Sequence, residues 1–301
     1  MLNQNKFENY IITAADTDLT IEAYLKQVLH FSNRNIQKLT RAKGIFINKK
    51  MAFLNRSLKE NDVLRVLILK DLDYGVTPES GSIEILYEDE DAIVLNKPPF
   101  QLVHPAGNTT SHTLANHLAY YFQSKNLLTT IRPIHRLDRD TSGCIIFAKN
   151  AYAQTQLEEQ LKLRTLKRNY FALIRGTIVP CDGTIVQPIG KHPTKANQRA
   201  VNTNGDTAIT HYQTHTSYSP NCTMLSLNLD TGRTHQIRVH LAYLGYPIIG
   251  DKMYGSRSSL IARQALHAES ITFQHLKTGE MINITATLPA DMKNLIAFYK
   301  P

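Results

Sequence analysis

Apolar residues recur at helical spacing in two stretches near the start of the chain, 21–28 and 32–44. Ser32 is a suitable N-cap for the second of these helices. Two short apolar runs, 45–48 and 63–67, then predict strands, because each is bounded by turn-forming residues. The order helix, helix, strand, strand predicts a small α/β module.

This module is expected to span residues 1–70, and a linker is expected at 71–82, where Asp, Gly, Pro and Ser gather without an apolar period. Strand-like runs follow at 83–87, 92–96, 143–149, 169–176, 208–212, 224–229, 271–275 and 282–288. Helices are expected at 111–123, at 150–163 with Asn150 as N-cap, and at 234–244 with Thr234 as N-cap. Strands outnumber helices and do not alternate strictly with them. The pattern therefore predicts an α+β domain over 83–301, with a mixed, largely antiparallel sheet and flanking helices.

The composition is that of an ordinary globular protein, with 42% hydrophobic and 20% charged residues in 301. No apolar run approaches the roughly 18–20 residues that span a bilayer, and the polar N-terminus lacks the features of a secretory signal. We therefore expect a cytoplasmic protein. Cys144, Cys181 and Cys222 are odd in number and far apart, so we expect reduced thiols.

A net charge of +9, spread over both parts of the chain, suits a polyanionic partner, although a merely soluble basic surface fits the charge equally well. The second predicted helix is more informative. Its cations Arg34, Lys38 and Arg41 follow the spacing i, i+4, i+7 and fall on one face. We expect this face to bind RNA, the alternative being a solvated helix surface.

Common catalytic signatures are missing from the sequence, including phosphate-binding Gly-rich loops, zinc-protease motifs and the nucleophile elbow of hydrolases. His235 and His240 are five residues apart, which does not match the i, i+4 spacing of a helical pair of metal ligands. We therefore expect neither a metal nor a cofactor. Carboxylates beside arginines remain as the candidate chemistry.

The segment His-Arg-Leu-Asp-Arg-Asp-Thr-Ser-Gly (135–143) forms a polar turn directly before an apolar strand, which is where scaffolds often present functional groups. Asp138 stands between Arg136 and Arg139, and a nearby guanidinium would keep this carboxylate ionised as a nucleophile or base. The alternative is a structural Asp that satisfies a turn.

A second polar segment, Thr-Gly-Arg-Thr-His-Gln-Ile-Arg-Val-His (231–240), leads from a Gly turn into a helix. Polar groups at a helix N-terminus form an anion site, either for a phosphate or for the carboxylate of Asp138. The alternative is an amphipathic helix with one wet side.

Together these two segments resemble the RluA family of pseudouridine synthases, and five further segments occur in the family's order. They are Ile93–Pro105, Lys167–Gly176, Thr207–Tyr212, Gly250–Gly255 and Arg263–Ala268. The residues Ser32–Asn48 resemble the S-four-type RNA-binding module that often accompanies this family. Phe100 stands where the family commonly has glycine, and Asp206 replaces a frequent Lys.

The resemblance implies an enzyme that detaches uracil from its ribose in RNA, turns the base and rejoins it through carbon, without metal or cofactor. Three catalytic residues are implied: Asp138 would attack the ribose or remove a ribose proton, and Arg238 would pair with Asp138 and hold it charged. Tyr170 would stack on the target base and assist proton transfer. Because the target base is hidden in a stack, it must flip out of the RNA, and Arg136 would fill the space that it leaves. The further RNA-binding residues implied by the resemblance are Lys97, His104, Arg139, Arg233, His235 and Gln236.

Two other classes of protein stay open at this stage. A non-catalytic RNA-binding protein would keep the charge and the first module, but it has no use for Asp138 with its arginines and Tyr170. A glycoside hydrolase needs two suitably spaced carboxyl groups, whereas Asp138 and Asp140 are two apart in one turn. For the pseudouridine synthase we expect a monomer that acts on ribosomal or transfer RNA.

Overall fold

The computed structural model describes residues 7–29, 31, 33–67, 71–219, 222–255 and 257–300. The chain divides into two compact units, Met1–Asp73 and Tyr74–Pro301. The segment expected as a linker falls largely within the second unit. Tyr74 and Val76 pack against that unit's core, and the N–H of Glu79 donates to the carbonyl of Asn116. The residues from Tyr74 to Ser82 therefore belong to the second unit, and the predicted linker does not extend beyond Asp73 in the described part of the chain.

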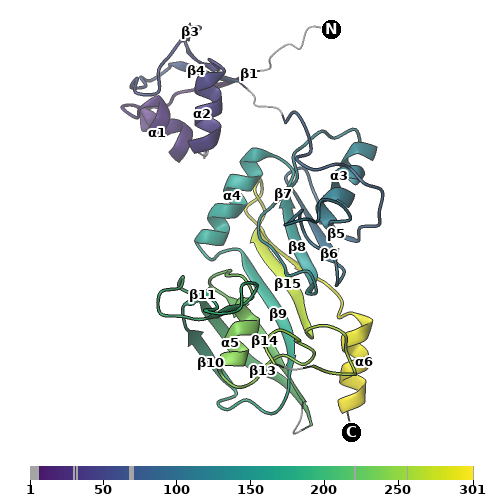
Figure 1. The fold of residues 1–301 in the computed structure, drawn as a ribbon. Helices are drawn as coiled ribbons and strands as arrows, with labels where there is room; N and C mark the ends of the chain where they lie inside the picture. The colour runs from purple at the N-terminus through teal and green to yellow at the C-terminus, as the bar shows by residue number, and fades with distance from the viewer. Residues whose placement is uncertain are drawn as a thin grey trace. The chain divides into compact units, whose positions relative to one another are not determined.

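The first unit carries the two predicted helices, α1 (Ile21–Gln27) and α2 (Asn33–Arg41), packed on an antiparallel sheet (Figure 1). The strand order is β1 (Phe7–Ile11), β4 (Val63–Leu67), β2 (Ile45–Ile47) and β3 (Lys50–Met51). A 3-10 turn at Ala14–Asp16 joins β1 to the helices. The hydroxyl of Thr20 caps α1, while the predicted cap Ser32 lies outside the described residues.

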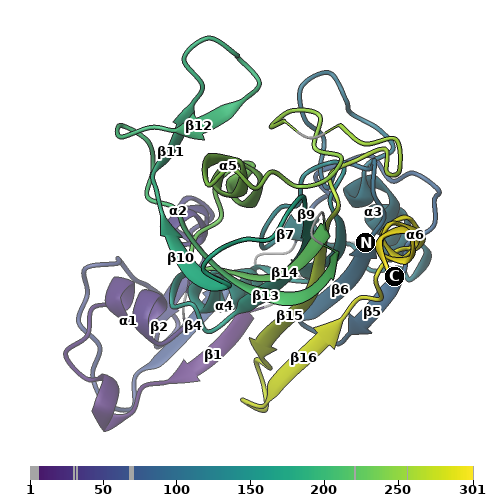
Figure 2. The same ribbon diagram turned by 90° about the horizontal axis from the view of Figure 1, so that it is seen from below.

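The second unit is built on a large sheet that confirms the predicted mixed, largely antiparallel α+β architecture (Figures 1 and 2). Its strand order is β10 (Asp182–Val186), β13 (Ile209–Ser219), β14 (Cys222–Leu229), β9 (Lys167–Ile174), β15 (Leu266–Gln274), β8 (Ser142–Ala148), β6 (Ala92–Lys97) and β5 (Ile85–Glu88). Two further strands join at the side, β16 (Met281–Thr285) on β15 and β7 (Arg132–Pro133) on β8. The only parallel pair among the described strands is β15 with β8.

Helices cover both faces of this sheet, so alternate residues of the central strands enter different cores. Ile93 and Leu95 of β6 join the larger core, whereas Ala92 and Val94 join the smaller one. The larger core also receives α3 (Leu114–Ser124), α5 (Gln236–Tyr243) and α6 (Ala290–Tyr299). The smaller core receives α4 (Ala151–Lys162), whose predicted cap Asn150 accepts the N–H of Ala153 at 2.7 Å.

A short hairpin, β11 (Ile189–Lys191) and β12 (Arg199–Val201), stands apart from the large sheet and beside α5 (Figure 2). The sequence pattern did not predict this hairpin. No helix in the described part of the chain combines the length and the apolar character needed to cross a membrane.

The polar segment 135–141 ends where β8 starts, and the parallel pairing of β8 with β15 requires glycine there. Gly143 has a φ of +110°, and a Cβ at this position would lie 2.1 Å from the carbonyl oxygen of Ala268 on β15. Such contact with backbone leaves no room for a side chain. Gly143 therefore holds the beginning of β8 close against the neighbouring strand.

We predict that Gly143→Ala lowers the free energy of unfolding by roughly 3 kcal/mol or prevents folding, because backbone strain and a clash act together. Gly176→Ala is the matched control, since Gly176 also has a positive φ, +86°, but nothing lies within 4 Å of its added Cβ. Strain alone should cost the control about 1 kcal/mol. Urea unfolding of both variants measures the difference, and equal losses would contradict the close approach of β8 to β15.

Candidate active site

Asp138 lies in the turn between β7 and β8, and the turn is fixed by one apolar side chain and one backbone hydrogen bond. Leu137 is buried in the larger core, and the N–H of Thr141 donates to the carbonyl of Asp138 at 3.1 Å. Asp138 itself is half-buried and lines a pocket of about 900 Å³. The turn thus presents this carboxylate to a concave site large enough for a nucleotide.

The carboxylate of Asp138 is held by Arg238 of α5, as the sequence predicted. Nη1 of Arg238 donates to Oδ2 of Asp138 at 2.8 Å. The other side of the same guanidinium binds Asp251 in a fork, with Nε to Oδ2 at 2.7 Å and Nη2 to Oδ1 at 3.0 Å. A planar fork of this kind fixes the orientation of the guanidinium as well as its charge. Asp251 therefore aims Nη1, the third nitrogen of the guanidinium, at Asp138.

Burial lowers the pKa of Arg238, but the hydrogen bonds and charges of Asp251 and Asp138 outweigh it and raise this pKa above its ordinary value. Arg238 is consequently a permanent cation although its side chain is only 7% exposed. Asp251 is fully buried and also accepts the N–H groups of Met253 and Tyr254. Asp251 lies in Gly250–Gly255, one of the segments that resemble the family, but no role was predicted for it.

A second layer of contacts supports this ion-pair network. The guanidinium of Arg238 lies 5.1 Å from the centre of the Tyr254 ring, which allows a cation–π interaction. The hydroxyl of Tyr254 accepts the N–H of Arg199 at 2.9 Å and lies 2.8 Å from Nδ1 of His235. Burial lowers the pKa of His235, so its ring is neutral at pH 7.

The beginning of α5 differs from the prediction. The N-cap is His235 in the left-handed conformation, with φ +60°, and Thr234 does not cap the helix. Gln236 instead orders the turn before the helix, because its Oε1 accepts the N–H of Arg233 at 2.9 Å and the hydroxyl of Thr231 at 2.7 Å. The left-handed residue turns the chain so that α5 begins one residue later than Thr234 would place it.

The prediction that Gln236 binds RNA is contradicted by this arrangement. Its amide nitrogen donates to the carbonyl of Ile209 and to the hydroxyl of Thr210, and the side chain is buried. Four internal hydrogen bonds use the full capacity of the amide. Gln236 is a structural residue at the base of the pocket.

Lys97 is the second correction. Its ammonium group is fully buried and donates to three carbonyl oxygens, those of Pro98, Gln101 and Arg139, at 2.8–2.9 Å. Burial lowers the pKa of Lys97 to about 7. With its donors used inside the protein, Lys97 does not face RNA; it ties the loop after β6 to the turn that carries Asp138.

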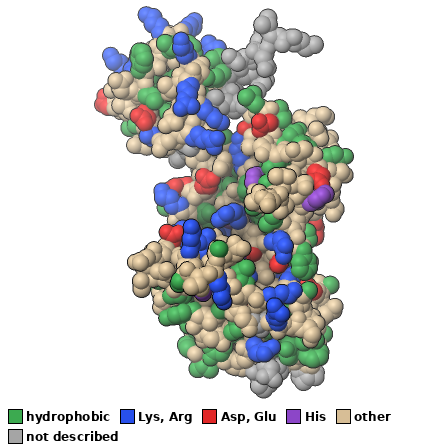
Figure 3. Space-filling model, in the orientation of Figure 1, with side chains coloured by type: hydrophobic (Ala, Val, Ile, Leu, Met, Phe, Trp, Pro, Cys, Tyr) green, Lys and Arg blue, Asp and Glu red, His purple; other side chains and the backbone are tan. Residues whose placement is uncertain are grey.

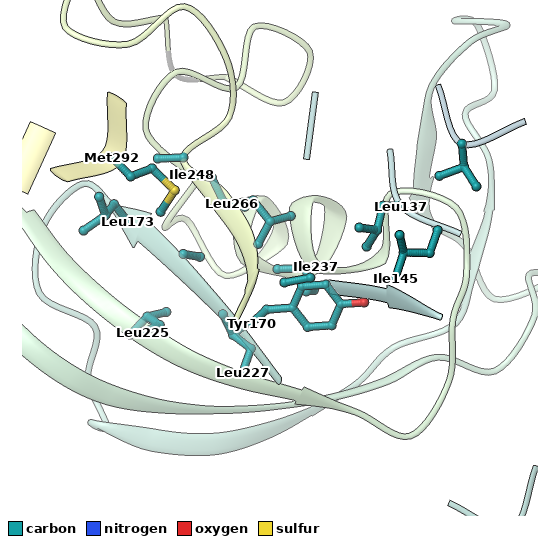
Figure 4. Close-up of a cluster of buried hydrophobic side chains, with 14 of the residues drawn as sticks. Leu137, Ile145, Tyr170, Leu173, Leu225, Leu227, Ile237, Ile248, Leu266 and Met292 are labelled. Carbon is teal, nitrogen blue, oxygen red and sulfur yellow. The ribbon is translucent and has the colours of Figure 1, made fainter. Parts of the chain in front are cut away.

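Tyr170 of β9 lines the same pocket and is 4% exposed. Figure 4 shows its ring beside Ile237 and Leu227, with the hydroxyl directed to the side of Leu137. Burial raises the pKa of Tyr170, so the phenol is neutral near pH 7. A flat, neutral and mostly apolar ring of this kind is a suitable stacking surface for a base.

The remaining predicted RNA-binding residues of this unit surround the pocket. Exposed arginines and half-buried histidines line it: Arg136, Arg139, Arg233, His104 and His235. Arg139 pairs with Asp140 at 2.8 Å, and Arg233 lies 3.6 Å from Asp206. Among the described residues Arg136 has no ion-pair partner. Figure 3 shows Lys and Arg side chains gathering on this face of the second unit.

A group of possible metal ligands lies elsewhere in the second unit. Glu79, His112 and His117 place their ligand atoms within 4.8 Å of one another, and His112 pairs with Glu79. None of the three lines the pocket of Asp138. The absence of a metal from the reaction stays a prediction.

Comparison with known proteins relates this site to one family. A family model described as RNA pseudouridylate synthase matches residues 91–243. An uncharacterized RNA pseudouridine synthase of Bacillus subtilis, YhcT, is 40% identical over 276 residues, which cover 91% of each chain. Ribosomal large subunit pseudouridine synthase D of Haemophilus ducreyi is 39% identical over 74% of this chain and 72% of its own.

Solved structures agree with these relationships. Human RNA pseudouridylate synthase domain containing 1 matches with a TM-score of 0.57 and 27% identity, over 73% of this chain and 97% of that chain. The comparisons favour neither a non-catalytic RNA-binding protein nor a glycoside hydrolase. The pocket of Asp138, Tyr170 and Arg238 lies almost entirely within the region that the family model matches. The predicted resemblance is confirmed: this chain belongs to the RluA family of pseudouridine synthases, the enzymes that isomerise uridine to pseudouridine within RNA.

Proposed function

We propose that this enzyme modifies uridine in the RNA of the large ribosomal subunit. Relatives named for that subunit support this substrate, among them synthase D of Xanthomonas campestris, which is 35% identical over 89% of this chain. We further propose that the protein acts in the cytoplasm as a monomer, without metal or cofactor.

The observation that carries the mechanism is the fixed Arg238 fork. Because Asp251 orients the guanidinium, Nη1 of Arg238 holds Oδ2 of Asp138 in one place while the pocket stays open in front of it. An ionised carboxylate held in this way is suited to attack C1′ of the ribose or to remove a ribose proton. Either reaction leads to cleavage of the bond between C1′ and N1 of uracil.

The other pocket residues serve the base after this bond has broken. The uracil turns and its C5 bonds to C1′, while Asp138 releases C1′ or returns the ribose proton. The proton on C5 then leaves and N1 takes up a proton, so that the product is an isomer of uridine. We assign Tyr170 to stack on the base through these steps, since its ring forms one wall of the pocket. Arg136 is exposed at the rim without an ion-pair partner among the described residues, which suits it to enter the space left by the flipped nucleotide.

The first unit would add affinity for RNA. Arg34, Lys38 and Arg41 are exposed on α2, whereas Ile36 and Leu39 of the same helix are buried. The helix therefore presents a basic face whose opposite side is anchored in the core. Cations presented in this way release counterions from RNA phosphates on binding.

We predict that Asp138→Asn abolishes turnover, with a loss on the order of 10³-fold or more, while RNA binding and folding persist. The replacement keeps the shape of the side chain, and its amide oxygen still accepts from Arg238, but the reacting charge is gone. Chemical mapping of pseudouridine in total RNA treated with each variant measures the effect.

Asp140→Asn is the control, because Asp140 lies in the same turn and binds the exposed Arg139. This control should retain most of the activity. If Asp140→Asn were the inactive variant and Asp138→Asn the active one, the assignment of the catalytic carboxylate would be wrong.

Asp251→Asn should lower kcat by roughly 10- to 100-fold with little change in KM, since the fork loses its charge and no longer fixes Arg238. The same change should reduce the free energy of unfolding by about 3 kcal/mol, because it leaves a buried guanidinium with one fewer counter-charge. Single-turnover kinetics separate the two parameters. A normal kcat in a destabilised protein would limit Asp251 to a structural role.

Replacing Arg34, Lys38 and Arg41 together with Ala should weaken RNA binding and flatten its dependence on salt. Each lost phosphate contact removes about 0.7 to 0.9 from the log–log slope, so three contacts remove about 2.1 to 2.7. Turnover at saturating RNA should persist. Replacing the exposed Lys49, Lys50 and Lys59 with Ala removes the same charge from the same unit and should leave the slope nearly unchanged. Equal effects of the two triple variants would show that the basic face of α2 contributes no more to RNA binding than other exposed lysines of the same unit.

A further inference from the structure

The β11–β12 hairpin places two cations directly opposite each other. In its register Lys191 pairs with Arg199, and Ile189 pairs with Val201. Directly paired residues of an antiparallel hairpin share one face, with Cβ atoms about 5 Å apart, so like charges at such a pair destabilise it. Ile189 and Val201 belong to a small apolar cluster with Val239 of α5, which shows that this face is turned toward the body of the unit.

No acidic side chain among the described residues forms an ion pair with Lys191 or Arg199; Asp206, which lies nearby, pairs with Arg233 instead. Between Asp182 and Asp206 the sequence contains Lys191, Lys195 and Arg199 but neither Asp nor Glu. No ion pair involves any of these three cations in the part of the chain that the structure describes. The fold therefore keeps a concentration of positive charge that an external anion would stabilise.

The cations border a hollow that continues into the catalytic pocket. A second pocket, of about 380 Å³, is lined by the hairpin, by the segment that follows it and by the turn before α5. Its lining includes the cations Lys191, Arg199 and Arg233, together with Asp206, which lies 3.6 Å from Arg233. Four residues line both pockets: Arg136, Gly232, Arg233 and Thr234. A strand of RNA with its uridine in the first pocket would thus have its neighbouring backbone at the second.

The hairpin is attached rigidly to the active site. The N–H of Arg199 donates to the hydroxyl of Tyr254, and Nε2 of Gln198 donates to the carbonyl of Met253 at 3.2 Å. Both contacts reach the segment that follows Asp251. The turn of the hairpin is ordered by Nδ1 of His192, which accepts the N–H of Thr194 and of Lys195. A preorganised site of this kind binds without a large cost in side-chain and loop entropy.

We propose that the β11–β12 hairpin and the turn before α5 form a binding site for the phosphodiester backbone next to the reacting uridine. This inference rests on the proposed action on RNA and extends it beyond the catalytic pocket. Lys191 and Arg199 bind phosphate from the hairpin, and Arg233 binds it from the opposite wall. Charge on the backbone thereby holds the RNA strand in register with Asp138, and this contributes to KM without taking part in the chemistry.

The test uses the full chain with Lys191→Ala and Arg199→Ala combined, and a transcript of large-subunit ribosomal RNA. Filter binding over a range of NaCl concentrations should show at least tenfold weaker binding at low salt. The log–log salt slope should be smaller by about 1.4 to 1.8, the value for two phosphate contacts. Turnover at saturating RNA should stay within twofold of the original, and the unfolding midpoint should stay equal or rise.

The variant Lys191→Glu separates binding from folding, because it places an acid opposite Arg199. Its unfolding midpoint should rise, while its affinity for the transcript should fall further than that of Lys191→Ala. Lys293→Ala combined with Lys300→Ala is the control, since both lysines are exposed near the C-terminus of the same unit. This control should bind with the original slope.

Two results would overturn the phosphate site. One is an unchanged slope and affinity in the hairpin variants, and the other is an equal loss in the control. A failure of the proposed function looks different, because the original protein would then form no pseudouridine in the transcript. In that case the filter-binding comparison still tests whether the hairpin binds RNA, because filter binding does not require turnover.

Discussion

The site depends on one guanidinium shared between two carboxylates. Arg238 binds the buried Asp251 through Nε and Nη2 and directs Nη1 at Asp138, which faces the pocket. The desolvation of a buried cation is costly, and only the two acids together compensate for it. The consequence is a carboxylate that is fixed in position and open to substrate on its other side. Tyr254 under the guanidinium and His235 beside it complete the layer that keeps this geometry.

The fold brings Asp138 and Arg238 together from positions 100 residues apart in the sequence. Asp138 precedes β8, and the close approach of Gly143 to β15 fixes the beginning of that strand. The buried ammonium of Lys97 ties the carbonyl of Arg139 to the loop after β6, which holds the same turn from the other side. Arg238 comes from α5, and Gln236 orders the turn that leads into this helix. The turn of Asp138 is thus held by backbone contacts together with the side chains of Leu137 and Lys97, and Arg238 then binds the carboxylate.

The sequence predicted most elements of the fold because both faces of the sheet are covered and the central strands are continuous apolar runs. It missed α6, although Met292, Leu295 and Ile296 follow helical spacing, and it missed the hairpin, whose strands of three residues are too short to show a period. The pairing of Arg238 with Asp138 was predicted. The spacing of residues along the sequence does not show which side chains are buried. Lys97 and Gln236 were therefore predicted to bind RNA, although both donate their hydrogen bonds to groups inside the protein. Asp251 matters because it binds Arg238, which is 13 residues away in the sequence, and a contact at this separation leaves no local sequence pattern.

The most direct test of this account is a crystal structure of the Asp138→Asn variant with a stem-loop that contains the modified uridine. We predict that the uridine lies flipped into the pocket, with its base on the ring of Tyr170 and its ribose against residue 138. Arg238 should keep its fork with Asp251 and its contact with the side chain at 138. A uridine bound away from this side chain, or an Arg238 that turns from Asp251 to the RNA, would contradict the central role of the shared guanidinium.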